Sequence, residues 1–160
     1  MKKLTTWLWL DGQAEAAANF YTSVFKDGAV ADSANYGDVG EEITGQKPGS
    51  VMMVQFEIMG QQFAALNGGP QFKFTEAISF EIPCENQEEV DYYWEKLSAV
   101  PEAEQCGWVK DKFGVSWQIV PVQLGKLMSD PDREKVNRVT QAMLGMKKLD
   151  IAGLEAAYNG

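Results

Sequence analysis

The feature that most constrains the fold is an internal repeat. Each half of the chain begins with an alternating apolar–polar run, continues with helical spacing, and ends in strand-like runs. In the first half the alternating run covers residues 5–10, and strand-like runs follow at 29–36, 51–58 and 61–66. The helical stripe between them consists of Ala17, Phe20, Tyr21, Val24 and Phe25. This half therefore predicts a βαβββ module over residues 4–66.

The second half repeats the same order. An alternating run at residues 77–82 places Ile78, Phe80 and Ile82 on its apolar side, and Asn86 with Glu89 resembles a capping box that starts a helix. A strand is expected near residues 102–104, and a hairpin over 105–120 turns at Phe113-Gly114. The second module thus spans residues 77–121. Repeats of this kind cannot bury their apolar faces alone, so residues 1–160 are expected to form a single domain.

Residues 122–160 form a helical tail. Asp130 with Pro131 predicts a helix start, Gly145 predicts its end, and Asp150 predicts the cap of a last helix. We expect the tail to pack on the sheet or on a partner chain. A homodimer is expected, because the edges of open sheets carry unpaired backbone groups and two-fold pairing is the commonest way to cover them.

Composition narrows the classes of partner. The net charge of -9 disfavours nucleic acid and anionic membrane surfaces, which both require clustered basic residues. No apolar run approaches the ~18 residues of a membrane span. Two cysteines are too few for a disulfide framework. The short apolar run after Lys3 ends at Asp11 without a cleavage-type sequence, so it does not match a secretory signal peptide. A cytoplasmic protein is expected.

Several segments resemble one family. They are residues 7–12 (WLWLDG), 19–21 (NFY), 66–70 (LNGGP), 90–94 (VDYYW), 105–108 (QCGW) and 114–121 (GVSWQIVP). Over about residues 4–158 the chain resembles the PhnB-like family, which carries the label demethylubiquinone methyltransferase and belongs to the vicinal-oxygen-chelate (glyoxalase/bleomycin-resistance) superfamily. The resemblance implies an α+β fold in which two βαβββ modules form a cupped mixed sheet with helices outside, here with C-terminal helices added.

Enzymes of that superfamily hold a divalent metal with His and Glu. The repeat maps these positions onto Thr5, Ala64, Gln118 and either Ala77 or Ser79, and the chain contains no His. Zinc or nickel requires several imidazole, thiolate or carboxylate donors. The sequence therefore predicts no bound metal, and no cofactor motif is present.

The period of two along each strand predicts which side chains face the cup. If Thr5 and Gln118 face it, the tryptophans of the first strand do too, opposite the helix-packed face. The predicted ligand-binding residues are Thr5, Trp7, Trp9, Asn67, Ser79, Ser116 and Gln118. Paired tryptophans with a few polar groups suit an apolar or aromatic ligand. Alternatively, the tryptophans fill the cup or a dimer seam without binding anything.

Two functions follow from this pattern. The first is a metal-independent module that binds a small organic molecule. The alternative is a metal-free enzyme acting on a small molecule, which includes the methyl transfer to a quinol precursor implied by the family label. In that case Glu57 or Glu81 is a candidate general base, and its pKa is expected to be raised if it is buried beside the tryptophans. Gln118 or Ser79 is a candidate for stabilising an oxyanion.

Overall fold

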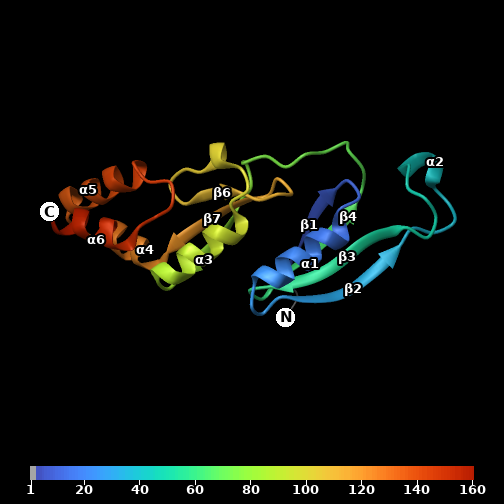
Figure 1. Cartoon of the computed structure of the whole chain (residues 1–160), viewed down its shortest axis with the longest axis horizontal. Helices are drawn as coiled ribbons and strands as arrows, with labels where there is room; N and C mark the ends of the chain where they lie inside the picture. The colour runs from blue at the N-terminus through green and yellow to red at the C-terminus, as the bar shows by residue number, and fades with distance from the viewer. Residues whose placement is uncertain (1–2) are drawn as a thin grey trace. The chain divides into compact units, whose positions relative to one another are not determined.

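A computed structural model describes residues 3–160 (Figure 1). The chain forms two units, residues 3–73 and 74–160, which are described separately. Both units contain a mixed sheet and helices, which confirms the predicted α+β class. Within residues 3–160 no helix is both long and apolar enough to cross a membrane.

The first unit is the predicted βαβββ module. Its elements are β1 (Thr5–Leu10), α1 (Ala14–Val24), β2 (Ala29–Asn35), the short α2 (Glu41–Thr44), β3 (Val51–Ile58) and β4 (Gln61–Asn67). The strand order is β1-β4-β3-β2, with β1 parallel to β4 and the other neighbours antiparallel. Met59 and Gly60 both have positive φ (49° and 71°), as a tight two-residue hairpin turn between β3 and β4 requires.

Helix α1 covers one face of this sheet (Figure 1). Ala14, Ala17 and Ala18 are fully buried, and their small side chains let the helix lie close to the strands. Tyr21 stacks on Phe56 with ring centroids 5.7 Å apart, and Phe56 in turn stacks on Phe63 at 5.3 Å. Leu8 and Leu10 of β1 are buried on the same side, so the predicted helix-facing residues of the first strand are confirmed.

The second unit begins with a smaller sheet. Its elements are β5 (Phe80–Cys84), α3 (Gln87–Leu97), a 3₁₀ turn (Pro101–Ala103), β6 (Trp108–Lys110) and β7 (Ser116–Pro121). The strand order is β5-β7-β6, with β5 parallel to β7 and β6 antiparallel to it. Asn86 caps α3 as predicted, because its Oδ1 accepts from the Glu89 backbone N–H at 3.0 Å. Val90 and Leu97 of α3 are buried against this sheet.

Two strand predictions in this half are wrong. The first strand starts at Phe80 rather than residue 77, and Ile78 is 73% exposed instead of facing the core. Its pairing with β7 begins at Phe80, opposite Trp117, so residues 77–79 form no ladder with that strand. The strand expected near residues 102–104 is instead the 3₁₀ turn that Pro101 starts, since proline fixes φ and lacks an N–H for a ladder.

Asp111 fixes the turn between β6 and β7. The residue is 1% exposed, and its Oδ1 accepts from the backbone N–H groups of Phe113 and Val115 at 2.8 and 3.0 Å. Its Oδ2 accepts from Trp117 Nε1 at 2.8 Å. The buried carboxylate is therefore satisfied by several donors, which stabilise the turn and orient the indole of Trp117.

The tail folds into three helices of the second unit, α4 (Val122–Met128), α5 (Arg133–Leu144) and α6 (Ile151–Asn159). They share a small core made of Val139, Leu149 and Leu154, against which pack Leu124, Leu127, Met143, Met146 and Tyr158. Backbone N–H groups of Cys106 and Gly107 donate to the carbonyls of Met146 and Lys147 at 2.9 and 2.7 Å. These bonds attach the tail to the turn before β6.

The caps of the tail helices match the prediction in part. Gly145 ends α5, and Asp150 caps α6 by accepting from the Gly153 N–H at 3.0 Å, both as predicted. The start of α5 was predicted at Asp130, but Asp132 is its cap. Asp130 instead accepts from the Asp132 N–H at 2.7 Å and from the Tyr158 hydroxyl at 2.5 Å. The carboxylate of Asp130, which the sequence predicted to cap α5, therefore binds Tyr158 of the distant helix α6 instead.

Candidate functional site

The face of the first sheet opposite α1 has an apolar centre. Strand register places Trp9, Leu66 and Met53 side by side in one row across β1, β4 and β3. The neighbouring row contains Trp7, Ala64 and Gln55. Trp7 is 54% exposed, whereas Ala64 beside it is fully buried. The large indole ring stands beside a small methyl side chain, so it offers an exposed apolar surface on which a flat molecule can stack.

The two predicted tryptophans have different surroundings. Trp9 Nε1 donates to the Gly69 carbonyl at 2.8 Å, and Phe72 meets its ring edge-on at 4.9 Å. A Cβ added at Gly68 would lie 2.3 Å from the same ring, so only glycine fits there. The loop after β4 thus holds Trp9 in place, whereas the exposed ring of Trp7 has room for a ligand.

Asn67 ties three segments of the first unit together. Its Oδ1 accepts from the Ala14 N–H at 2.9 Å, which satisfies a free donor at the start of α1. Its Nδ2 donates to the Val51 carbonyl at 3.0 Å, and its own carbonyl accepts from the Tyr36 hydroxyl at 2.6 Å. The buried carboxamide therefore has a structural role, which sequence reasoning missed. Its predicted contact with a ligand stays a prediction.

The open face of the second sheet is polar. Gln118 lies at the centre of β7, and its Nε2 donates to the Ser79 Oγ at 2.9 Å, so two predicted site residues are in contact. Ser116 lies on the same face of β7, is 2% exposed, and its Oγ has no hydrogen-bond partner among the described residues. Across the strands, Gln118 is in register with Glu81 of β5 and Trp108 of β6.

Sequence reasoning did not include Trp108 in the site, although a signal for it existed. The predicted hairpin around Phe113-Gly114 pairs Lys110 with Ser116 and Trp108 with Gln118 once its register is known. Val109 is buried toward α3, and Trp108 therefore lies on the opposite, open face. Lys110, on the same face, forms an ion pair with Glu76. That ion pair lowers the pKa of the Glu76 carboxyl.

Neither candidate general base is buried as the prediction required. The side chain of Glu57 is 43% exposed and lies 3.4 Å from the Lys3 Nζ, on the open face of the first sheet. Glu81 is exposed on the open face of the second sheet. Both carboxylates are therefore solvated, and Glu81 is the one placed beside other predicted site residues, Gln118 and Ser79.

A comparison of the sequence with protein-family models identifies the family of this chain. The family model described as 3-demethylubiquinone-9 3-methyltransferase matches residues 2–120 of the chain. The chain belongs to this family. The PhnB-like resemblance of the sequence is thereby confirmed.

One solved structure supports this assignment, and a second has the same fold. A PhnB protein from Bacillus cereus, described with the same methyltransferase name, is 34% identical, with a TM-score of 0.61 over 76% of this chain and 100% of that chain. Protein PA1353 from Pseudomonas aeruginosa has the same fold at 16% identity, with a TM-score of 0.56 over 76% and 98% of the two chains. Lactoylglutathione lyase from Agrobacterium tumefaciens aligns at 16% identity, with a TM-score of 0.46 over 77% and 95%. Among curated proteins, none matches the chain.

The metal ligands of the wider superfamily do not fit this member of the family. Thr5, Ala64 and Gln118 stand at the mapped positions, with Ala77 or Ser79 as the remaining one, and these side chains supply no imidazole, thiolate or carboxylate. Among residues 3–160 no group of three His, Cys, Asp or Glu side chains is arranged to hold a metal ion. The tryptophan, amide and hydroxyl groups on the open faces can stack and form hydrogen bonds.

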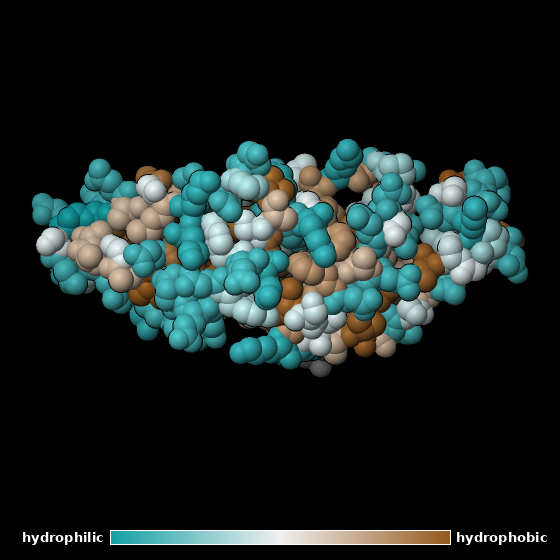
Figure 2. Space-filling model, in the orientation of Figure 1, coloured by the Kyte–Doolittle hydropathy of each residue, from teal (hydrophilic) through white to brown (hydrophobic). Residues whose placement is uncertain are grey.

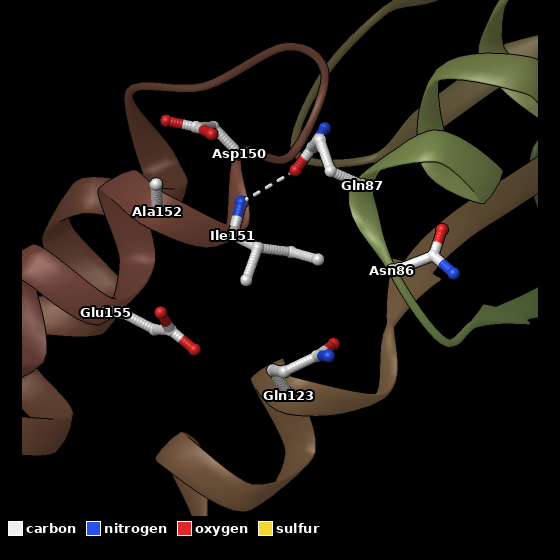
Figure 3. Close-up of a pocket in the computed structure, with 7 residues that line it drawn as sticks. All are labelled: Asn86, Gln87, Gln123, Asp150, Ile151, Ala152 and Glu155. Atoms are coloured by element: carbon white, nitrogen blue, oxygen red, sulfur yellow. Dashed lines mark hydrogen bonds between the residues drawn. The ribbon is translucent and has the colours of Figure 1, made fainter.

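A separate cavity of about 330 Å³ lies where the tail begins, at the end of the family match (Figure 3). Ile151, Gln123 and Glu155 extend toward this space, while Asp150 points away from it. Gln87 bridges its upper wall, because its Oε1 accepts from the Ile151 N–H at 2.9 Å and its Nε2 donates to the Leu149 carbonyl at 3.1 Å. Gln123 Nε2 donates to the Glu85 carbonyl at 2.8 Å. The cavity thus lies between the start of α3, helix α4 and the start of α6.

Proposed function

We propose that this chain binds a small organic molecule, aromatic or apolar, on the open faces of its sheets and without a metal ion. The observation that carries the proposal is Trp7, which is 54% exposed although Leu8 and Leu10, on the opposite face of the same strand, are buried. An exposed indole beside the buried methyl group of Ala64 offers stacking area at little entropic cost. The open face of the second unit carries its own polar groups, the hydrogen-bonded pair Gln118–Ser79.

Intrinsic tryptophan fluorescence tests this function. Titration with 2-naphthol, indole and a short-chain benzoquinol should quench fluorescence saturably for at least one compound. Replacing Trp7 by Leu should weaken that binding about tenfold, because a stacking partner contributes about 1 kcal/mol or more. Trp94→Phe is the control, since Trp94 lies on α3 and not on an open face. Absence of saturable binding by every compound up to millimolar concentration would contradict the proposal.

The second candidate function is methyl transfer, which the name of the family suggests and the position of Glu81 favours. In such a reaction a quinol oxygen would attack the sulfonium methyl group, the methyl–sulfur bond would break to leave a thioether, and the quinol proton would pass to the carboxylate of Glu81. Incubation with S-adenosylmethionine and a demethylated quinol tests it by mass spectrometry. Detection of the methyl ether, lost in Glu81→Gln but retained in Glu57→Gln, would support catalysis; unchanged quinol would exclude this reaction.

A further inference from the structure

We infer that the open face of the second sheet selects a planar cation, an amidinium or guanidinium group attached to an apolar ring. The inference rests on the proposed binding function and adds the chemical class of the ligand. Glu81, Gln118 and Trp108 occupy one row across the three strands β5, β7 and β6. Neighbouring strands are about 4.8 Å apart, so the row offers a carboxylate, an amide and an indole within about 10 Å.

The exposed polar groups of this row accept hydrogen bonds rather than donate them. Gln118 Nε2 is used by its bond to the Ser79 Oγ at 2.9 Å, which turns the Oε1 of the same amide toward other donors. Glu81 is exposed, and its carboxylate oxygens accept hydrogen bonds. A ligand that lies along the row must therefore supply N–H or O–H groups.

A buried hydroxyl group lies next to this row. Ser116 is 2% exposed, and its Oγ has no hydrogen-bond partner among residues 3–160. It lies two residues before Gln118 on β7 and therefore on the same side of the sheet. Its Oγ is closed to a ligand on the surface, so the exposed hydrogen-bonding groups of the row are those of Gln118 and Glu81.

The charges around the row favour a cation. Lys110 is the nearest basic residue on this face, one row away in register with Ser116, and its ammonium group is paired with Glu76. Within residues 3–160 no basic side chain forms an ion pair with Glu81. The indole of Trp108 attracts a cation through the negative face of its ring. An anionic ligand would instead meet the carboxylate of Glu81 in a chain of net charge -9.

Three probes of one shape separate the effects of charge and of stacking. Benzamidine carries a planar amidinium, benzamide is its neutral analogue, and benzoate is its anionic analogue. Calorimetric titration at low ionic strength should give a benzamidine affinity about tenfold above that of benzamide, with benzoate weaker than both. Glu81→Gln should lower the benzamidine affinity about tenfold toward that of benzamide and leave benzamide unchanged.

Matched variants make the test specific. Glu57→Gln removes a carboxylate from the open face of the other sheet, and it should leave the benzamidine affinity unchanged. Trp108→Leu should weaken benzamidine and benzamide together. Equal binding of benzamidine and benzamide, or an equal loss in Glu57→Gln and Glu81→Gln, would overturn the inference while leaving the binding function in place. Absence of binding by all three probes, together with the naphthol, indole and quinol panel, would overturn both.

Discussion

The thiol of Cys84 shows at the scale of one residue how burial changes chemistry. Cys84 is fully buried at the end of β5, and this desolvation, with a smaller contribution from the charge of Glu89, raises the pKa of the thiol from 9.0 to about 12. The folded protein therefore retains the thiol proton at a pH where the unfolded chain loses it. The stability that the protonated thiol contributes is complete below pH 9 and decreases as the pH rises toward 12.

Urea unfolding between pH 8.5 and 10.5 measures this effect. Above pH 9 the free energy of unfolding should fall by up to about 1.4 kcal/mol per pH unit through this group. Cys84→Ala is the control: it lowers stability at every pH by leaving a small cavity, but its decline with pH should be shallower than that of the unmodified protein. Parallel declines in the two proteins would show that Cys84 does not titrate as its burial indicates.

Side-chain faces were predictable from the sequence, but side-chain partners were not. The period of two along β1 correctly separated Leu8 and Leu10 from the tryptophans. It could not show that Trp9 bonds the Gly69 carbonyl while Trp7 stays exposed, because that difference depends on a loop about sixty residues away. Asn67 is similar: its bond to Ala14 joins the end of one strand to the start of a distant helix. Local pattern contains no information about such long-range contacts.

At the scale of elements, Gln87 connects α3 to α6. Its side chain accepts from the Ile151 N–H and donates to the Leu149 carbonyl, on the wall of the cavity in Figure 3. Gln87→Ala should lower the free energy of unfolding by about 1–3 kcal/mol, since it removes two half-buried hydrogen bonds and leaves the Ile151 donor unpaired. The amides of α6 should exchange faster, while those of α1 in the other unit keep their rates.

The neighbouring residue Glu88 provides the matched control. It is exposed in the same first turn of α3, so Glu88→Ala should change stability by only a few tenths of a kcal/mol and leave exchange in α6 unchanged. An equal effect of both variants on α6 would mean that the start of α3 as a whole, rather than the Gln87 side chain, holds the tail.

The elements that the sequence misplaced are those whose ends depend on partners. β5 begins where β7 begins to pair with it, and α5 begins at Asp132, while Asp130 accepts from the Tyr158 hydroxyl of α6. By contrast, the limits of β3 and the cap of α6 are set by residues within a few positions, and these were predicted correctly. The same holds for the candidate site. The period of two predicted which face each side chain is on, but placing Trp108 beside Gln118 required the register of the β6–β7 hairpin.

At the scale of the whole molecule, the tail uses most of its apolar residues internally. Val139, Leu149 and Leu154 are buried in the core of the tail, whereas Leu144 is 59% exposed. On the face shown in Figure 2, hydrophobic residues appear as separate patches among hydrophilic ones. Self-association through the tail alone is therefore less favoured than the sequence indicated. The sheet edges remain available for pairing with a second chain, because the edge strand β2 is exposed along nearly its whole length.

We still predict a homodimer, formed through sheet edges rather than through the tail. A stable interface buries on the order of 1,000 Å² or more, and at ~25 cal/mol per Å² of apolar area its hydrophobic contribution exceeds the entropic cost of association when the packing is good. Light scattering at micromolar concentration should give a mass near twice 17.7 kDa. Leu144→Asp should leave that mass unchanged, because Leu144 lies on the tail and not on a strand. A mass near 17.7 kDa for the unmodified protein would refute the dimer, whereas dissociation by Leu144→Asp alone would show that the tail forms the interface.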